Sequence, residues 1–149
     1  MEEIHALIVH CLDKVLAYRR HIHAHPELSQ EERTTAQFVA GVLREIGLSP
    51  IEGLGGYSVV AVIQGNKGPG KCIGLRADID ALPLHETTSL PYVSQNEGIC
   101  HACGHDMHTA MLLGCAHVLY HLRDQFSGCV KLIFQPAEES VLSGGAPDM

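Results

Sequence analysis

Apolar residues recur at helical spacing in two stretches of the first fifty residues. Pro26 separates the two stretches, because the residue before a proline is disfavoured in the α conformation. Ser29-Gln-Glu-Glu32 has the pattern of a capping box and predicts the start of the second helix. Gly47 suits its C-terminal end. The apolar face of the first predicted helix, residues 3–24, is Ile4, Leu7, Ile8, Cys11, Leu12, Val15 and Leu16. The buried stripe of the second is Ala36, Val39, Val42, Leu43 and Ile46.

Three further runs predict strands, and one predicts a helix. Residues 57–63 and 72–79 are β-branched and apolar, and the turn-rich GNKGPG between them predicts a hairpin. Residues 81–98 hold two prolines and no periodicity, so we expect a long, functional loop. Residues 130–134 are apolar throughout, which predicts a central strand. The inner side of the predicted helix 105–122 is Met111, Leu112, Cys115, Val118 and Leu119.

The element order α-α-β-β-α-β predicts an α/β fold. A chain of 149 residues is long enough to bury one core. Three strands and one covering layer of helices would leave a sheet edge unpaired. We therefore expect residues 1–149 to form the first portion of a larger catalytic domain.

Net charge and the distribution of apolar residues exclude some classes of binding partner and indicate a cellular compartment. The net charge of −7, with no basic cluster, argues against nucleic-acid and anionic-membrane partners. The N-terminus is acidic, without the basic region of a signal peptide, and no apolar run reaches membrane-spanning length. We therefore expect a cytoplasmic protein with reduced thiols. Its six cysteines are Cys11, Cys72, Cys100, Cys103, Cys115 and Cys129.

Two short motifs carry candidate metal ligands. In Cys103-Gly104-His105 a thiol and an imidazole are separated by one glycine, which permits the tight turn needed to bind one ion. A helix is predicted to start there, and its dipole favours the thiolate. Glu138-Glu139 follows a strand and a proline, at a predicted strand end. Taken alone, the first motif is more often a helix cap and the second a solvated charge pair.

Cys100 and Cys103 also form a C-x-x-C motif, which allows a thiol-redox reading. Redox motifs of this type follow a strand early in a βαβ unit, whereas this one follows a long loop. A four-cysteine zinc site needs a second such motif, and the sequence has none. We therefore interpret Cys100 as a bystander, with redox chemistry as the weaker alternative.

Four sequence blocks together resemble one enzyme family. HAHPELSQEE, GLRADIDALPLHE, CHACGHDMHTAMLLG and IFQPAEES are similar, in this order, to blocks of the metal-dependent amidohydrolases. These are the hippurate hydrolases, N-acyl-L-amino-acid amidohydrolases and indoleacetyl-amino-acid hydrolases. The resemblance implies the N-terminal part of a three-layer α/β/α zinc-peptidase-like catalytic domain, without its lid and dimerisation domain.

The resemblance also implies roles for individual residues. Cys103, His105 and Glu139 would be metal ligands, Glu138 the general base, and Asp80 the residue that orients a ligand. The roles of four neighbouring residues stay open: Asp78, Asp106, His101 and His108. For the alternating histidines we expect packing and surface hydrogen bonds rather than chelation: His21, His23 and His25.

The activity implied is hydrolysis of N-acyl amino acids to a carboxylic acid and an amino acid. Two divalent ions would take part, Mn²⁺ or Zn²⁺, with Co²⁺ or Ni²⁺ as further options. The family's remaining ligands and its dimer-forming domain are expected beyond Met149, so we expect the chain alone to be inactive and its parent to be a homodimer or homo-oligomer. Two alternatives are a non-catalytic metal-binding or regulatory piece and, less favoured, a thiol-redox protein.

Overall fold

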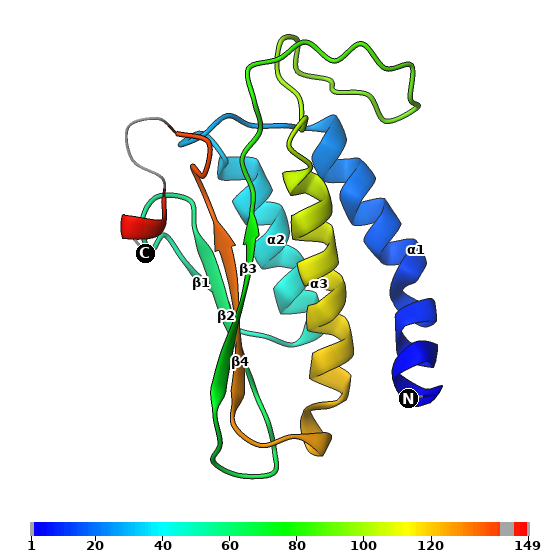
Figure 1. The fold of residues 1–149 in the computed structure, drawn as a ribbon, viewed down its shortest axis with the longest axis vertical. Coiled ribbons are helices and arrows are strands. Elements are labelled where there is room, and N and C mark those ends of the chain that lie inside the picture. The colour runs from blue at the N-terminus through cyan, green and yellow to red at the C-terminus, as the bar shows by residue number, and fades with distance from the viewer. Residues whose placement is uncertain (1, 141–144, 149) are drawn as a thin grey trace.

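The computed structural model describes residues 2–140 and 145–148, which form a mixed α/β fold (Figure 1). No helix in these residues is long and apolar enough to cross a bilayer. The helices are α1 (Glu2–Ala24), α2 (Arg33–Ile46) and α3 (His105–His121), with short 3₁₀ turns η1 (Arg123–Gln125) and η2 (Ala146–Asp148). The strands are β1 (Ile51–Glu52), β2 (Val59–Gln64), β3 (Cys72–Asp78) and β4 (Cys129–Gln135).

The four strands form one sheet in the order β1-β2-β4-β3. β4 is central, as predicted, and runs antiparallel to β2 and parallel to β3. The predicted hairpin between β2 and β3 is wrong, because β4 lies between them. The glycine-rich turn reverses the chain direction, but turn residues do not specify which strand becomes the neighbour. The late apolar run enters the middle, where both of its edges are paired.

The hydrophobic core lies between the sheet and the helices α2 and α3, with α1 packed against α3 (Figure 1). All five predicted stripe residues of α2 are buried. On α3 the prediction is partly wrong: Leu112 is buried, but Met111 and Cys115 are exposed, and Leu113 and Ala116 face the core instead. α3 is apolar around most of its surface, so periodicity alone does not select its inner face. On α1 most of the predicted stripe is exposed: Ile4, Ile8, Leu12 and Leu16.

The start of α2 uses a different cap from the one predicted. Glu32 occupies the N-cap position but makes no capping bond with its side chain. The Glu27 carboxylate instead accepts the backbone N–H groups of Thr34 and Thr35, at 3.0 and 2.8 Å. The predicted capping box is therefore wrong in its chemistry, although the helix begins at the expected place. At the other end Gly47 adopts a left-handed φ of 103°, as its sequence position indicates.

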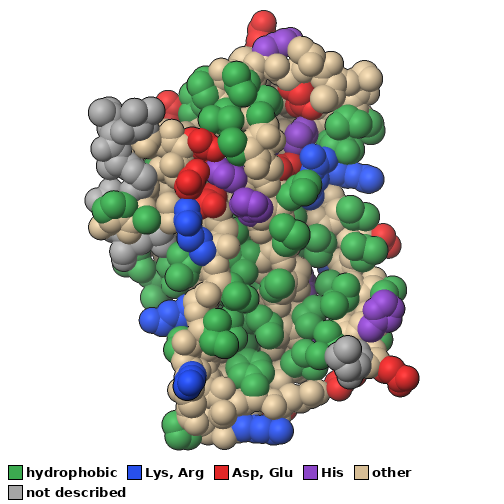
Figure 2. Space-filling model, viewed as in Figure 1, with side chains coloured by type: hydrophobic (Ala, Val, Ile, Leu, Met, Phe, Trp, Pro, Cys, Tyr) green, Lys and Arg blue, Asp and Glu red, His purple; other side chains and the backbone are tan. Residues whose placement is uncertain are grey.

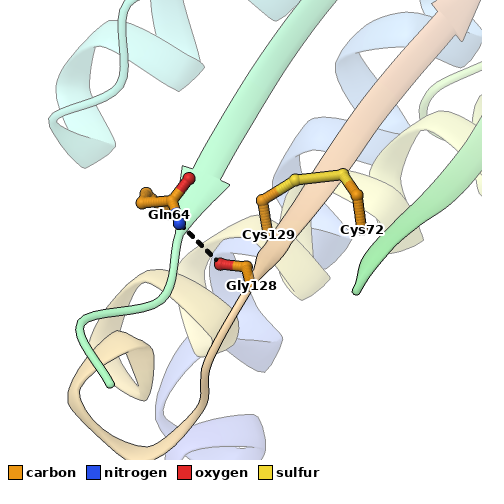
Figure 3. The surroundings of a disulfide bond; sticks show 4 residues. All are labelled: Gln64, Cys72, Gly128 and Cys129. Atoms are coloured by element: carbon orange, nitrogen blue, oxygen red, sulfur yellow. Dashed lines mark hydrogen bonds between the residues drawn. A yellow bond between two sulfur atoms is a disulfide. The ribbon is translucent and has the colours of Figure 1, made fainter. Parts of the chain in front are cut away.

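A disulfide joins Cys72 to Cys129 at the amino ends of β3 and β4 (Figure 3). The expectation of six reduced cysteines is wrong for this pair. The two residues are direct partners in the parallel register, with Cα atoms 4.5 Å apart, which is within reach of a disulfide. Sequence spacing alone does not reveal that register. The remaining cysteines are free: Cys11, Cys100, Cys103 and Cys115.

Candidate metal centre

The candidate ligands gather at the carboxyl ends of β3 and β4. Because these strands are parallel, the residues that follow them meet at one edge of the sheet. Asp80 follows β3, Glu138 and Glu139 follow β4, and α3 begins at the same edge with His105. Figure 2 shows acidic and histidine side chains gathered in this region, with a largely apolar surface below.

His105 is buried and faces two sets of oxygen atoms. Its Nδ1 lies 3.0 Å from the backbone oxygen of Asp80 and 3.1 Å from that residue's Oδ1. A carbonyl oxygen only accepts, so Nδ1 carries the proton. In the neutral ring Nε2 then offers a lone pair, and it points toward Glu138 Oε2 at 3.8 Å and Glu139 Oε1 at 3.9 Å. A metal-binding histidine commonly has this tautomer, with the ring N–H held by a carboxylate or carbonyl oxygen so that the other nitrogen faces the ion.

Asp80 is buried and connects three parts of the site. Its carboxylate accepts the Ser29 hydroxyl at 2.7 Å and the backbone N–H of Glu139 at 2.9 Å, in addition to His105 Nδ1. Burial alone would raise the pKa of Asp80, but these hydrogen bonds and the His105 charge outweigh it and lower the pKa to about 2. For His105 burial lowers the pKa, yet Asp80 and Asp78 outweigh it and the pKa is raised. Asp80 therefore orients His105 and the backbone of Glu139 together.

Cys103 lies on the exposed turn before α3. Gly104, at a left-handed φ of 82°, reverses the chain between Cys103 and His105. A hydrogen bond to Glu139, then burial and the nearby carboxylates, raises the pKa of Cys103 to about 11. The expected thiolate is therefore disfavoured here, because the negative charges outweigh the helix dipole. A divalent cation would reverse this balance, since it stabilises thiolate and carboxylates together.

Among the described residues, two groups of side chains have donor atoms close enough to hold one ion. One is His105, Glu138 and Glu139, and the other is Asp78, His105 and His108; within each, the donor atoms lie within 4.8 Å of one another. Both groups include His105. Asp78 is already paired with Arg76. Cys103 belongs to neither group but contacts Glu139. The first group thus contains two of the three predicted ligands and the predicted base.

Asp106 and His101 belong to neither of these groups. Asp106 is fully buried and lies 2.7 Å from His23 Nδ1 and 2.9 Å from Arg19 Nε. The other His23 nitrogen lies 3.1 Å from Glu86. His101 is buried without a hydrogen-bond partner among the described residues, and burial lowers its pKa to about 4. We expected His23 to pack or to bond at the surface, and its buried network was missed because its partners are distant in sequence.

Comparison with known proteins points to one family. A sequence profile of the peptidase family M20/M25/M40 matches residues 74–149. The "Thermostable carboxypeptidase 2" of Saccharolobus solfataricus is 50% identical over 138 residues, 92% of this chain and 35% of the relative. The "N-acyl-L-amino acid amidohydrolase" of Geobacillus stearothermophilus is 46% identical over 148 residues, 99% of this chain and 40% of the relative.

Solved structures agree with the sequence comparison. The crystal structure of a dinuclear metal-binding peptidase of the M20 family from Bacillus subtilis superimposes with a TM-score of 0.82 and 41% identity. The match covers 90% of this chain and 36% of the other. The present chain thus spans well under half the length of the proteins that it matches, and it has the fold of the corresponding part of their catalytic domain.

Proposed function

Because the chain belongs to the peptidase family M20/M25/M40, we propose that it carries metal-binding and proton-transfer residues for hydrolysis of the amide bond of N-acyl amino acids. One observation supports this most: His105 Nε2 lies within 4 Å of both Glu138 and Glu139, while Asp80 holds the opposite side of the ring. Imidazole, thiol and carboxylate at one edge form a donor set suited to a transition-metal ion.

In this proposal Cys103, His105 and Glu139 hold the metal. A divalent ion bound there supplies Lewis-acid activation of an amide carbonyl and of water. Asp80 keeps the proton on His105 Nδ1 and holds the backbone of Glu139. Glu138 has 40% of its side chain exposed, so water and substrate can reach its carboxylate. It accepts a proton from water and passes it to the nitrogen of the leaving amine.

We further propose two ions, Mn²⁺ or Zn²⁺, with Co²⁺ or Ni²⁺ as substitutes. Three ligands are too few for two ions, so other ligands would come from the longer protein. We also propose a small-molecule N-acyl amino acid as substrate and a homodimeric or homo-oligomeric parent protein. The dinuclear metal-binding peptidase supports the number of ions, and the N-acyl-L-amino acid amidohydrolase supports the class of substrate.

We also propose a cytoplasmic location, and the Cys72–Cys129 disulfide is the observation that weighs against it. The location can be tested by trapping free thiols in cell extracts with an alkylating reagent and determining whether this pair is reduced or oxidised. A reduced pair agrees with the cytoplasm, and an oxidised pair favours an oxidising compartment.

The decisive test is amino-acid release from hippurate and N-acetyl amino acids with added Mn²⁺ or Zn²⁺ and an EDTA control. We expect no release by this chain and metal-dependent release by a chain extended to the length of its relatives. Release by these 149 residues would overturn the proposed inactivity of the chain. No release by the extended chain would favour a non-catalytic metal-binding role. Light scattering would then measure the molar mass with and without metal, to show whether metal changes the assembly of the chain.

A thiol-redox role receives little support from the geometry. Cys100 is buried, and burial first, then Glu86, raises its pKa. The pKa of Cys103 is raised as well. A redox-active C-x-x-C motif needs a readily formed thiolate. Activity that is lost in Cys103→Ala but kept in Glu138→Gln would nevertheless favour redox chemistry over hydrolysis.

A further inference from the structure

Glu32 is a fully buried carboxylate that supplies no predicted ligand. It lies just before α2, and none of its side-chain surface is accessible. Its Oε1 accepts the backbone N–H of Ala137 at 2.7 Å, across 105 positions of sequence. Its Oε2 has no hydrogen-bond partner among the described residues. Burying a carboxylate is unfavourable unless it forms specific contacts, so this contact needs an explanation beyond helix capping.

Ala137 belongs to the turn that presents the two glutamates. It has a left-handed φ of 54°, which a residue with a Cβ rarely adopts. Pro136 before it cannot donate a backbone hydrogen bond. Two carboxylates therefore fix the turn: Glu32 accepts from the N–H of Ala137, and Asp80 accepts from the N–H of Glu139. Glu138 lies between these two anchored residues.

Helix capping does not account for the Glu32 side chain. The N–H groups of Thr34 and Thr35 in the first turn of α2 are already bonded to Glu27. The segment before α2 contacts the other side of the site as well, because Ser29 donates its hydroxyl to Asp80. This segment lies outside the residues matched by the family profile. The segment thus forms hydrogen bonds to the residues that follow both β3 and β4, and it supplies no predicted ligand.

We propose that Glu32 is a positioning residue of the metal centre. Its hydrogen bond to Ala137 holds the turn in the conformation that directs Glu138 and Glu139 toward His105. The inference rests on the proposed function, in that it takes Glu139 as a ligand. Partners of metal ligands commonly change metal affinity by about 10–100-fold when they are removed.

The test compares Co²⁺ binding by the wild type, Glu32→Ala and Glu32→Gln, each in a chain extended to the length of its relatives, so that the ligands proposed for the longer protein are present. Bound Co²⁺ gives a near-ultraviolet charge-transfer band from the Cys103 thiolate and visible bands that report the remaining ligands. We expect Glu32→Ala to weaken Co²⁺ binding by about tenfold or more and to change the visible bands, while the thiolate band remains. Glu32→Gln keeps an oxygen acceptor for the N–H of Ala137 and should restore most of the affinity.

Glu31→Ala is the matched control, because Glu31 is the adjacent, exposed glutamate. It should bind Co²⁺ like the wild type. Far-ultraviolet circular dichroism checks that each variant folds. If Glu32→Ala does not fold, Glu32→Asp takes its place, since it keeps the charge and withdraws the carboxylate by one methylene. It should lose affinity in the same way.

Two failures are distinguishable. A wild-type chain that binds no Co²⁺, or binds it without a thiolate band, would overturn the assigned ligands and thus the proposed function. A wild-type chain that binds Co²⁺ as expected, with an affinity and spectrum that Glu32→Ala leaves unchanged, would overturn only the role of Glu32.

Discussion

The two ends of the β3–β4 pair have opposite construction. At the amino ends Cys72 and Cys129 are covalently joined, and the approach to β4 is tight, since a Cβ at Gly128 would collide with the backbone of Lys71. At the carboxyl ends the register finishes at Asp78 and Gln135. Beyond it lies the turn with the two glutamates, whose backbone N–H groups at Ala137 and Glu139 are bonded to buried carboxylates. The same two strands thus carry a covalent link at one end and a cluster of charge at the other.

This difference separates stability from function along one sheet. The amino end contributes by restricting the unfolded chain. The carboxyl end keeps several negative groups close together, which opposes folding unless a cation is bound there. Substitutions at the amino end should therefore change the free energy of unfolding and leave metal binding alone. Substitutions at the carboxyl end should chiefly change chemistry.

The largest effect is expected for Glu138→Gln in the extended, active chain. Glutamine keeps the shape of the side chain but cannot accept the proton from water. We expect the rate of hydrolysis to fall by about 10²–10⁴-fold, with Co²⁺ affinity almost unchanged. The measurement is kcat for an N-acyl amino acid beside a Co²⁺ titration. Glu97→Gln, an exposed glutamate that belongs to neither group of candidate ligands, is the control. A variant that keeps half its activity would exclude Glu138 as the base.

Loss of the disulfide should come next, and it should act on stability alone. The bond closes a loop with a sequence separation of 57, for which chain-entropy estimates give about 4 kcal/mol and typical measurements about 2–4 kcal/mol. We expect Cys72→Ser to lower the free energy of unfolding by that range in urea titrations. Cys115→Ser, which changes an exposed free thiol, should have little effect. A parallel loss of Co²⁺ affinity would show that the two ends are coupled.

Asp80→Asn should weaken metal binding while leaving the amino end intact. Asparagine has a similar shape, but it offers one acceptor oxygen to three donors: Ser29, His105 and the N–H of Glu139. We expect Co²⁺ affinity to fall by about 10–100-fold. Asp13→Asn, at an exposed position of α1, is the matched control. If the two variants bound Co²⁺ with equal affinity, Asp80 would have no role in positioning the metal ligands.

Local patterns predicted the inner face of α2, because that face depends on neighbouring residues. The inner stripe of α2 follows from the amphipathic spacing of residues such as Val39 and Leu43. Cys103 and His105 were chosen as ligands from the resemblance of their sequence block to the amidohydrolases, and this choice stays a prediction. On α3, apolar residues such as Met111 surround the helix, so spacing did not identify the buried side.

Contacts between distant segments could not be predicted in the same way. The disulfide depends on the register of β3 against β4, and the hairpin error came from the same missing information. Glu32 resembled a capping residue because its partner, Ala137, is 105 positions away. A capping-box pattern describes only its own turn, whereas a buried carboxylate bonds to whichever donor the fold brings to it.

The smallest effect concerns two histidines of α3 whose pKa values move in opposite directions. The carboxylates of Asp80 and Asp78 raise the pKa of His105. The pKa of His117 is lowered, first by burial and then by the nearby Lys14 and His121. Glu45 opposes this lowering more weakly. The Nε2 atom of His117 lies 3.1 Å from the Tyr18 hydroxyl. Below pH 6.5 the unfolded chain therefore binds a proton at His117 more readily than the folded chain does. This contribution lowers stability as the pH falls and becomes constant below the folded pKa. Urea titrations between pH 7.5 and about 5 should show a shallower decline in His117→Asn than in the wild type, and identical slopes would contradict the assignment.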